Sequence, residues 1–396
     1  MPDVDPTLAP PSARLLRLPE LPASMGYGEE HDLLRWSARR WLDEKSNLSS
    51  VRRLVDDPVG FDPALVLEMA DLGWLSVGDL EGEIGPVHLA VLAEEMGRVL
   101  MPSPYLGSAL VLTALSASAS PAQRAGLEPS LSDGTKLGSL ALEESRGGLD
   151  GGTLSTRAEH DGDFVVLSGE KIHVGWGAHA NLVIVSAKEA GGGIALYAVP
   201  LPSPGVSVDA EAGVDSTRRT SRVSFHLARL PASCRLDGDA RSALPQVTAI
   251  GALALAAEMT GAADAVLEMT RAYACQRVQF GRAIGSFQAV KHPLVDLMIG
   301  VELARSLVYG AAALFAEGNL DDALIAARMA KAHASEVFAG AVQRGVQLHG
   351  GFGFTWEADL HFFFKRMLAT RASFGDAAHH KRKLAASLFG QLPDEP

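Results

Sequence analysis

The stretch YACQRVQFGRAIGSFQ, residues 273–288, decides the fold of this chain, because it separates two long helical segments. Turns are expected at Gly281 and Gly285, and a new helix is expected to begin at the end of the stretch. The planar guanidinium of Arg277 beside exposed turn backbone would suit a phosphate. A second stretch, QLHGGFGFTWE at 347–357, has glycines where a backbone can approach another molecule closely. Taken alone, both stretches are equally compatible with a plain helix–turn–helix and a glycine-capped helix.

Helical patterns continue on both sides of the first stretch. Asn319 or Asp321 can cap a later helix, which is expected to end at Gly350-Gly351. Before it runs a heptad track, in steps of four and three, that suits a helix packed nearly parallel to its neighbours. Its members are Val290, Leu294, Leu297, Val301, Ala304, Val308, Ala311 and Phe315. We therefore expect a C-terminal helical bundle over residues 238–396.

The rest of the chain divides into three parts. Residues 1–26 are rich in Pro and Ser and are predicted to form a flexible arm. Residues 27–136 repeat apolar side chains at three- and four-residue steps, which predicts a helical domain. Residues 137–237 contain short β-branched or aromatic runs between turn signals, which predicts a small antiparallel β-domain.

Composition excludes several classes of protein. The chain has 396 residues and a formal charge of −12, which disfavours binding to nucleic acid or to an anionic membrane. Its strongest apolar run, 247–257, is shorter than the ~20 residues that cross a bilayer, so we expect no membrane insertion. The two cysteines, Cys234 and Cys275, offer neither a disulfide framework nor a CxxC site, and are expected to be buried thiols in a reducing cytoplasm. The adjacent His379 and His380 would point apart on a helix, so no metal site is predicted.

Together, the two opening stretches resemble the acyl-CoA dehydrogenase family. They lie about 70 residues apart in a helix–β–helix frame, and the resemblance covers the chain from about residue 27 to 390. Residues 224–236, SFHLARLPASCRL, also resemble the family's last β-strand and its exit into the bundle. The resemblance implies an α+β, mostly α fold: an N-terminal helical domain, a middle antiparallel β-domain and a C-terminal four-helix bundle. It also implies dimers, or tetramers that are dimers of dimers.

The resemblance further implies FAD bound between subunits, an acyl-CoA substrate and an electron-transfer acceptor. In that family the residues matching these motifs hold the adenosine diphosphate half of a flavin that lies in the partner's site. The residues that correspond here are Arg277 on the diphosphate, Phe280 beside it, Gln288, and the turn of Gln347, Leu348, His349, Gly350 and Gly351. Alternatively, these residues simply maintain a dimer contact of the bundle.

The family's catalytic base is missing from both positions where it would be expected. The reaction removes the proton α to the thioester, so a carboxylate must lie against that carbon. One family position falls on Phe374 and the other, 26 residues before Arg277, falls on Gly251. Glu258 and Asp376 are the nearest substitutes, although we favour a hydrogen-bonded core role for Glu258 and a cap or flavin-side contact for Asp376.

The segments that would hold the flavin ring also depart from the family. In LEESRGGLD, residues 142–150, Glu143 stands where the family has a Thr whose hydroxyl serves the flavin. At 173–175 the sequence His-Val-Gly lacks both the family's Trp and its hydroxyl residue. The residues that would hold the flavin ring in this chain are therefore degraded, while the residues that would contact FAD in a partner's site are retained.

This asymmetry leads to four hypotheses. The first is a half-site subunit of an FAD-dependent acyl-CoA dehydrogenase, resembling the β-subunit of the α2β2 heterotetramers that act on steroid side chains. The second is a homo-oligomeric enzyme whose base is Asp376, Glu258 or another acid. The third is different chemistry on the same fold, such as desulfination, and the fourth is a non-enzymatic scaffold.

Overall fold

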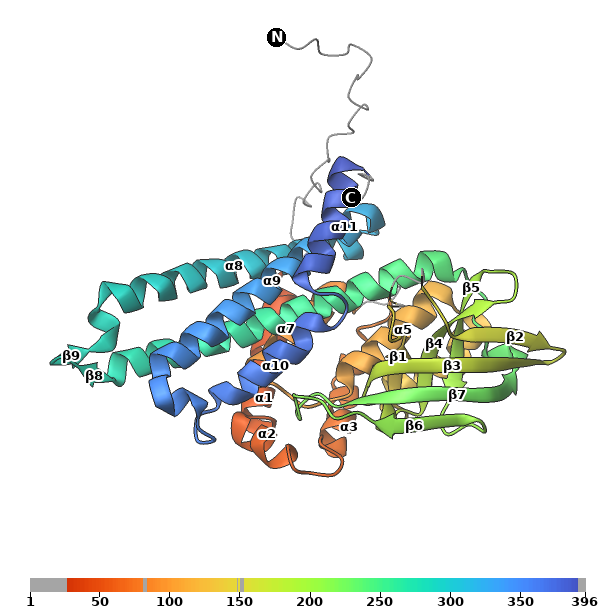
Figure 1. The fold of residues 1–396 in the computed structure, drawn as a ribbon, viewed down its shortest axis with the longest axis horizontal. Coiled ribbons are helices and arrows are strands. Elements are labelled where there is room, and N and C mark those ends of the chain that lie inside the picture. The colour runs from red at the N-terminus through yellow and green to blue at the C-terminus, as the bar shows by residue number, and fades with distance from the viewer. Residues whose placement is uncertain (1–26, 81–83, 148, 150–152, 391–396) are drawn as a thin grey trace, which may run out of the picture.

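A computed structural model describes residues 27–80, 84–147, 149 and 153–390 of the chain (Figure 1). The arm predicted for residues 1–26 lies outside the described residues. Helices occupy the first part of the chain, a sheet the middle and longer helices the last part, which confirms the predicted fold class.

Short helices form the first part, and local caps explain several of their boundaries. Asn47 accepts a hydrogen bond from the Ser50 amide at the start of α2, and Asp62 accepts one from the Ala64 amide at the start of α3. Pro63 occupies the first turn of α3, where its missing N–H costs nothing. The helices are α1 (Glu29–Lys45), α2 (Leu48–Leu54), α3 (Pro63–Asp71), α4 (Pro86–Val99), α5 (Tyr105–Ser118) and α6 (Pro121–Ser132).

The middle part is one curled sheet in the order β1-β4-β2-β3-β7-β6, with β5 paired to β4. Its strands are β1 (Gly138–Ala141), β2 (Arg157–Asp161), β3 (Phe164–Gly175), β4 (Leu182–Glu189), β5 (Ile194–Pro200), β6 (Val206–Ala210) and β7 (Thr220–Pro231). The predicted antiparallel pairing is confirmed for β2–β3, β3–β7, β4–β5 and β6–β7, but β4 runs parallel to both β1 and β2. A parallel pair needs a long connection, and the pattern of apolar residues within a strand does not encode its direction.

The last part is a bundle of α7 (Ala240–Gln276), α8 (Gln288–Ala316), α9 (Leu320–His349) and α10 (Leu360–Ala372), with α11 (Ala377–Phe389) against α9. A short hairpin of β8 (Val278–Gln279) and β9 (Arg282–Ala283) joins α7 to α8. The prediction that both cysteines are buried is wrong, because Cys275 is exposed just before this hairpin and Cys234 is half-buried. Most of the heptad track is buried, including Val301, Ala304, Val308 and Ala311, so it faces the bundle as predicted.

Two helices, α7 and α8, are long and apolar enough to cross a membrane by length and composition. The apolar window of α7 is 89% buried and that of α8 is half-buried within the fold. Burial of this extent in α7 is that of a core helix, because its side chains already have apolar neighbours in the bundle.

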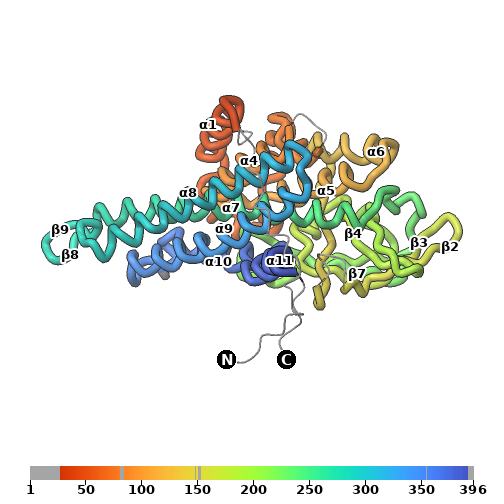
Figure 2. Tube along the Cα trace, turned by 90° about the horizontal axis from the view of Figure 1, so that it is seen from above, coloured from red at the N-terminus to blue at the C-terminus, as the bar shows by residue number. Residues whose placement is uncertain are grey.

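The molecule is elongated, as Figures 1 and 2 show. The β8–β9 hairpin lies at one end of the bundle and the sheet lies at the other end. Helix α7 runs between them and packs against α4, α5, α8 and α9. The fold therefore has two separate ends. The hairpin end carries the two stretches that opened the sequence analysis, and the sheet end carries the segments 142–150 and 173–175.

Candidate functional site

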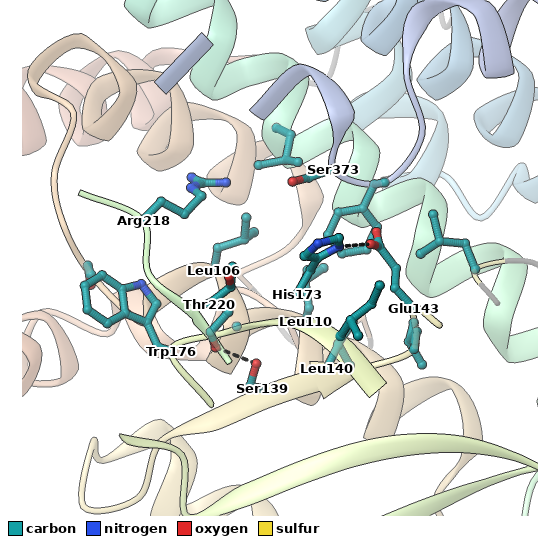
Figure 3. Close-up of a pocket in the computed structure, with 18 of the residues that line it drawn as sticks. Leu106, Leu110, Ser139, Leu140, Glu143, His173, Trp176, Arg218, Thr220 and Ser373 are labelled. Carbon is teal, nitrogen blue, oxygen red and sulfur yellow. Dashed lines mark hydrogen bonds and ion pairs between the residues drawn. The ribbon is translucent and has the colours of Figure 1, made fainter. Parts of the chain in front are cut away.

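A cavity lies where the three parts of the chain meet, and we call it the interdomain cavity (Figure 3). Its walls come from α5 and the turn before it, from strands β1 and β3, from the segment before β7, from α7 and from the turn after α10. Most of the wall is apolar, and a few polar groups face inward. The lining residues used below are Leu106, Leu110, Leu140, Glu143, His173, Trp176, Thr217, Arg218, Leu255, Ser373 and Phe374.

Gly251 and Phe374, the positions where the resemblance places the base, lie against each other, and Phe374 lines this cavity. Phe374 has φ +54°, and its ring lies directly over Gly251 of α7. A Cβ atom at Gly251 would stand 2.5 Å from the ring, closer than any real contact, so the ring fills the space that a side chain there would use. Gly251 and Phe374 are therefore a packed pair that provides no proton acceptor.

The turn that carries Phe374 is fixed by two basic side chains from other helices. Lys331 on α9 donates from Nζ to the Gly375 carbonyl at 2.9 Å and to the Arg371 carbonyl at 3.2 Å. His380 on α11 hydrogen-bonds through Nε2 to the Phe374 carbonyl at 3.0 Å. Burial lowers the pKa of Lys331 to about 7 and that of His380 to about 4. The unusual backbone conformation of Phe374 is thus held in place by the surrounding structure.

Glu258 belongs to a buried ion cluster. Its Oε1 accepts from Nη1 of Arg366 at 2.8 Å, and its Oε2 is paired with Nη2 of Arg218. Asp215 accepts from Nε of the same Arg366 at 2.7 Å. Burial acts to raise the pKa of Glu258, but the two arginines hold it below its usual value. Both oxygens of Glu258 are committed to guanidinium groups, which is the arrangement of a structural carboxylate.

Asp376 is the N-cap of α11. Its Oδ1 accepts from the His379 amide at 2.7 Å, and this hydrogen bond is the first cause of a pKa below the ordinary value of the carboxyl group. Asp376 is not among the residues that line the interdomain cavity. Its geometry is that of a helix cap.

Two neighbouring glutamates in the segment after β1 have different partners. Glu144 is buried and accepts from Nζ of Lys171 at 2.8 Å and from the Thr156 amide at 3.0 Å. Burial acts to raise the pKa of Glu144, but these hydrogen bonds lower it to about 2. Glu143 faces the cavity and pairs with Nδ1 of His173 at 3.0 Å, a hydrogen bond that raises the pKa of His173 (Figure 3).

The sequence comparison identified Glu143 and His173 separately, as departures from the family, and missed that they form a pair. Their contact depends on the segment after β1 lying beside β3, where the Ile172 amide donates to the Glu143 carbonyl at 3.0 Å, and neither segment reveals this alone. The left-handed conformation of His173, φ +54°, turns its ring toward Glu143. Gly148 and Asp150 of the same segment lie outside the described residues.

The two opening motifs meet at the far end of the bundle. The rings of Tyr273 on α7 and His349 on α9 stack with centroids 4.2 Å apart. Phe280, in the hairpin, is 92% exposed, and a Cβ added at Gly350 or Gly351 would meet no atom within 4 Å. Arg277, Gln288 and Gln347 are also exposed, whereas Leu348 is half-buried and His349 is buried. The structure brings these residues together on an open surface.

This surface does not belong to the cavity of the same chain. Arg277 follows Leu255, the residue of α7 that lines the cavity, by 22 positions. At 1.5 Å per helical residue this separates the two by about 33 Å along the helix. Since Figure 1 shows the hairpin and the sheet at opposite ends, one chain does not fold its motif surface onto its own cavity.

The two ends differ in how well they suit FAD. At the far end Arg277 is exposed, makes no side-chain ion pair with another described residue, and lies beside an open glycine turn, which fits a diphosphate. At the cavity the Glu143–His173 pair stands where the resemblance places a hydroxyl and a Trp, which does not fit the flavin ring. Among the described residues, no group of three or more His, Cys, Asp or Glu side chains could hold a metal ion.

Comparison with known proteins identifies the class of protein. Models of the N-terminal, middle and C-terminal domains of acyl-CoA dehydrogenase match residues 28–135, 139–227 and 225–389. The chain belongs to the acyl-CoA dehydrogenase family, whose members are flavoprotein oxidoreductases that act on acyl-CoA.

Individual similar proteins have more specific names than the family models. The acyl-CoA dehydrogenase IpdE2 of Mycobacterium tuberculosis is 32% identical over 343 residues, covering 85% of this chain and 91% of that protein. The ChsE4-ChsE5 complex of Mycobacterium tuberculosis superposes with a TM-score of 0.84 at 27% identity, covering 93% of this chain and 100% of the matched one. A variant of the Tcur3481-Tcur3483 steroid ACAD gives a TM-score of 0.82 at 29% identity, covering 92% and 98%.

Proposed function

We propose that this chain is a half-site subunit of an FAD-dependent acyl-CoA dehydrogenase. It would complete the FAD site of a related partner subunit, which supplies the base and the flavin-ring segments for α,β-desaturation of an acyl-CoA. A heterotetramer in the cytoplasm that passes electrons to an electron-transfer acceptor is part of this proposal.

The packing of Phe374 over Gly251 carries the proposal. Both family positions for the base are occupied by this pair, and the ring leaves no room for a side chain at Gly251. The two substitute acids have other roles, since Glu258 is bound to two arginines and Asp376 caps α11. A cavity with this wall has lost the group that removes the α proton.

The open motif surface supports the second part of the proposal. Arg277, Phe280 and the turn at Gly350 are exposed far from the cavity of their own chain, as residues that serve another subunit's site would be. Two of the similar solved structures, ChsE4-ChsE5 and Tcur3481-Tcur3483, are named as pairs of proteins.

Flavin content of the chain alone and of its native assembly tests the proposal. The chain purified alone should hold little FAD and show no dehydrogenation. The assembly isolated from the native source should hold one FAD per heterodimer, that is, one FAD for every pair made of this chain and its partner. Stoichiometric FAD with turnover in the lone chain would refute the half-site role.

A matched pair of variants locates the contribution of this chain. Arg277→Ala should strip most of the FAD from the assembly, because it removes the guanidinium assigned to the diphosphate. Arg222→Ala is the control: Arg222 is an exposed arginine of β7 that pairs with Glu170 on the sheet, and its loss should leave flavin content unchanged. Equal flavin content in both variants would favour a scaffold role.

A second candidate function rests on the Glu143–His173 pair. Glu143 lies inside the interdomain cavity and is hydrogen-bonded to an imidazole, the arrangement of an acid–base pair. A homo-oligomeric enzyme using Glu143 as its base should lose turnover in Glu143→Gln while keeping its flavin. The half-site role instead predicts no turnover by the lone chain either before or after this substitution.

A further inference from the structure

Two arginines of the buried ion cluster are satisfied to very different degrees. Arg366 donates from Nε to Asp215, from Nη1 to Glu258, and from Nη2 to the Thr217 hydroxyl at 2.7 Å and the Leu100 carbonyl at 3.3 Å. Arg218 donates to Glu258 through Nη2, and its other N–H groups have no acceptor among the described residues. One guanidinium is therefore saturated, while its neighbour keeps open donors.

The open donors of Arg218 lie at the interdomain cavity. Arg218 is one of the lining residues, and its side chain is 18% exposed. Burial lowers the pKa of Arg218 despite the pairing with Glu258, and the nearby charge of Arg366 acts in the same direction. The two arginines and the two carboxylates of the cluster match in number, so Arg218 offers unused N–H groups rather than surplus charge.

The rest of the cavity is suited to a hydrocarbon. Leu106, Leu110, Leu140, Trp176 and Leu255 provide apolar walls. Figure 3 shows Arg218 and the Glu143–His173 pair at different places around these walls, with Ser373 between them in this view. A largely apolar pocket with a few inward polar groups is the usual composition of a small-molecule site.

The acid in the cavity does not oppose an anion at Arg218. Glu143 is already paired with His173 at 3.0 Å, and that hydrogen bond favours the charged imidazole. A guanidinium with unused N–H groups binds a carboxylate through charge-assisted hydrogen bonds, which are stronger where water is excluded.

We propose that the interdomain cavity binds an apolar carboxylate, with the carboxylate on the free N–H groups of Arg218 and the hydrocarbon against the leucines and Trp176. This inference goes beyond the proposed function, because it uses only contacts among residues of this chain. Binding itself requires no flavin and no partner subunit.

Titration calorimetry of the full chain with decanoate and decanol tests the proposal. The two probes share their hydrocarbon chain and differ in the charged group that Arg218 would recognise. We expect decanoate to bind one per chain and at least tenfold more tightly than decanol. Equal affinities, or no binding of either probe, would overturn the proposal.

Arg218→Met tests which residue sets the preference, since it keeps most of the side-chain length and removes the charge. The preference for decanoate should disappear in this variant and persist in Arg222→Met, whose arginine is exposed on β7. A preference that survived in Arg218→Met would contradict the assignment.

Leu106→Trp provides a test that leaves the ion cluster intact, because the larger side chain fills the cavity from α5. Both probes should lose affinity at least tenfold, and unchanged binding would place the ligand elsewhere. These binding measurements test the carboxylate site, whereas the proposed function is tested by the flavin content of the chain and its assembly, so failure of one proposal can be told from failure of the other. A chain that discriminated between the probes but also bound its own FAD would retain this inference and lose the half-site role.

Discussion

The middle of α7 and its C-terminal end treat charged side chains in opposite ways. Near the interdomain cavity Glu258 is buried, and its two oxygens are committed to Arg366 and Arg218. At the C-terminal end Arg277 is exposed and makes no side-chain ion pair within the described part of the chain. The first arrangement stabilises the chain itself, whereas the second is available to another molecule. Substitutions near Glu258 should therefore change mainly the free energy of unfolding, whereas substitution of Arg277 should change mainly the binding of another molecule.

The largest effect should come from Glu258→Ala. The change leaves Arg366 and Arg218 buried without their shared carboxylate, and breaking a buried ion pair costs about 3–5 kcal/mol of unfolding free energy. Denaturant unfolding of the purified chain measures this loss. A change below about 1 kcal/mol, the range of exposed ion pairs, would contradict the structural role of Glu258.

A smaller loss is expected for Gly251→Ala, which sets a Cβ atom against the ring of Phe374. Overpacking of this kind costs about 1–3 kcal/mol. The double variant Gly251→Ala with Phe374→Leu should lose less than the two single variants together, because the smaller side chain relieves the contact. Additive losses in this cycle would show that the two residues do not form a packed pair.

Asp376→Ala should cost about 1 kcal/mol, the ordinary contribution of an N-cap. Asp376→Asn keeps a cap acceptor and should retain most of the stability while removing the charge. If Asp376 were instead the catalytic base, both variants would abolish turnover of the assembly equally, so stability and activity measured together separate the two roles.

The smallest effect on stability is expected at the motif surface. Arg277→Ala removes an exposed side chain and should change the free energy of unfolding by less than about 0.5 kcal/mol. The same variant should markedly reduce the flavin content of the assembly, and this dissociation of stability from binding defines the surface as a binding site. A large loss of stability in the lone chain would mean that Arg277 supports the hairpin.

Much of the fold was predictable because local patterns carry it. The helix ending near Gly350 was expected from its glycines, and α9 ends at His349. The heptad track predicted which face of α8 is buried, since its period matches that of helix packing. Strand direction was not predictable: β1 and β4 became parallel neighbours through a connection that no strand pattern describes.

The candidate site was predictable only in part, since its residues come from distant segments. The sequence identified Gly251, Phe374, Glu143 and His173 one at a time. The structure showed that they form two pairs, one a packed contact and one a hydrogen bond. Arg218 carried no sequence motif, and its open N–H groups became visible only beside the saturated Arg366.

The sequence by itself determined the family, the order of helices and strands, and the residues Phe374 and Gly251 at the positions where the resemblance places the base, because residue types and their spacing are local properties. Tertiary structure alone decided that Phe374 fills the space over Gly251, that Glu258 is bound within an ion cluster, and that the motif surface lies about 33 Å along α7 from the cavity. Burial and charge compensation depend on residues brought together from distant parts of the chain, and only the folded chain sets those distances.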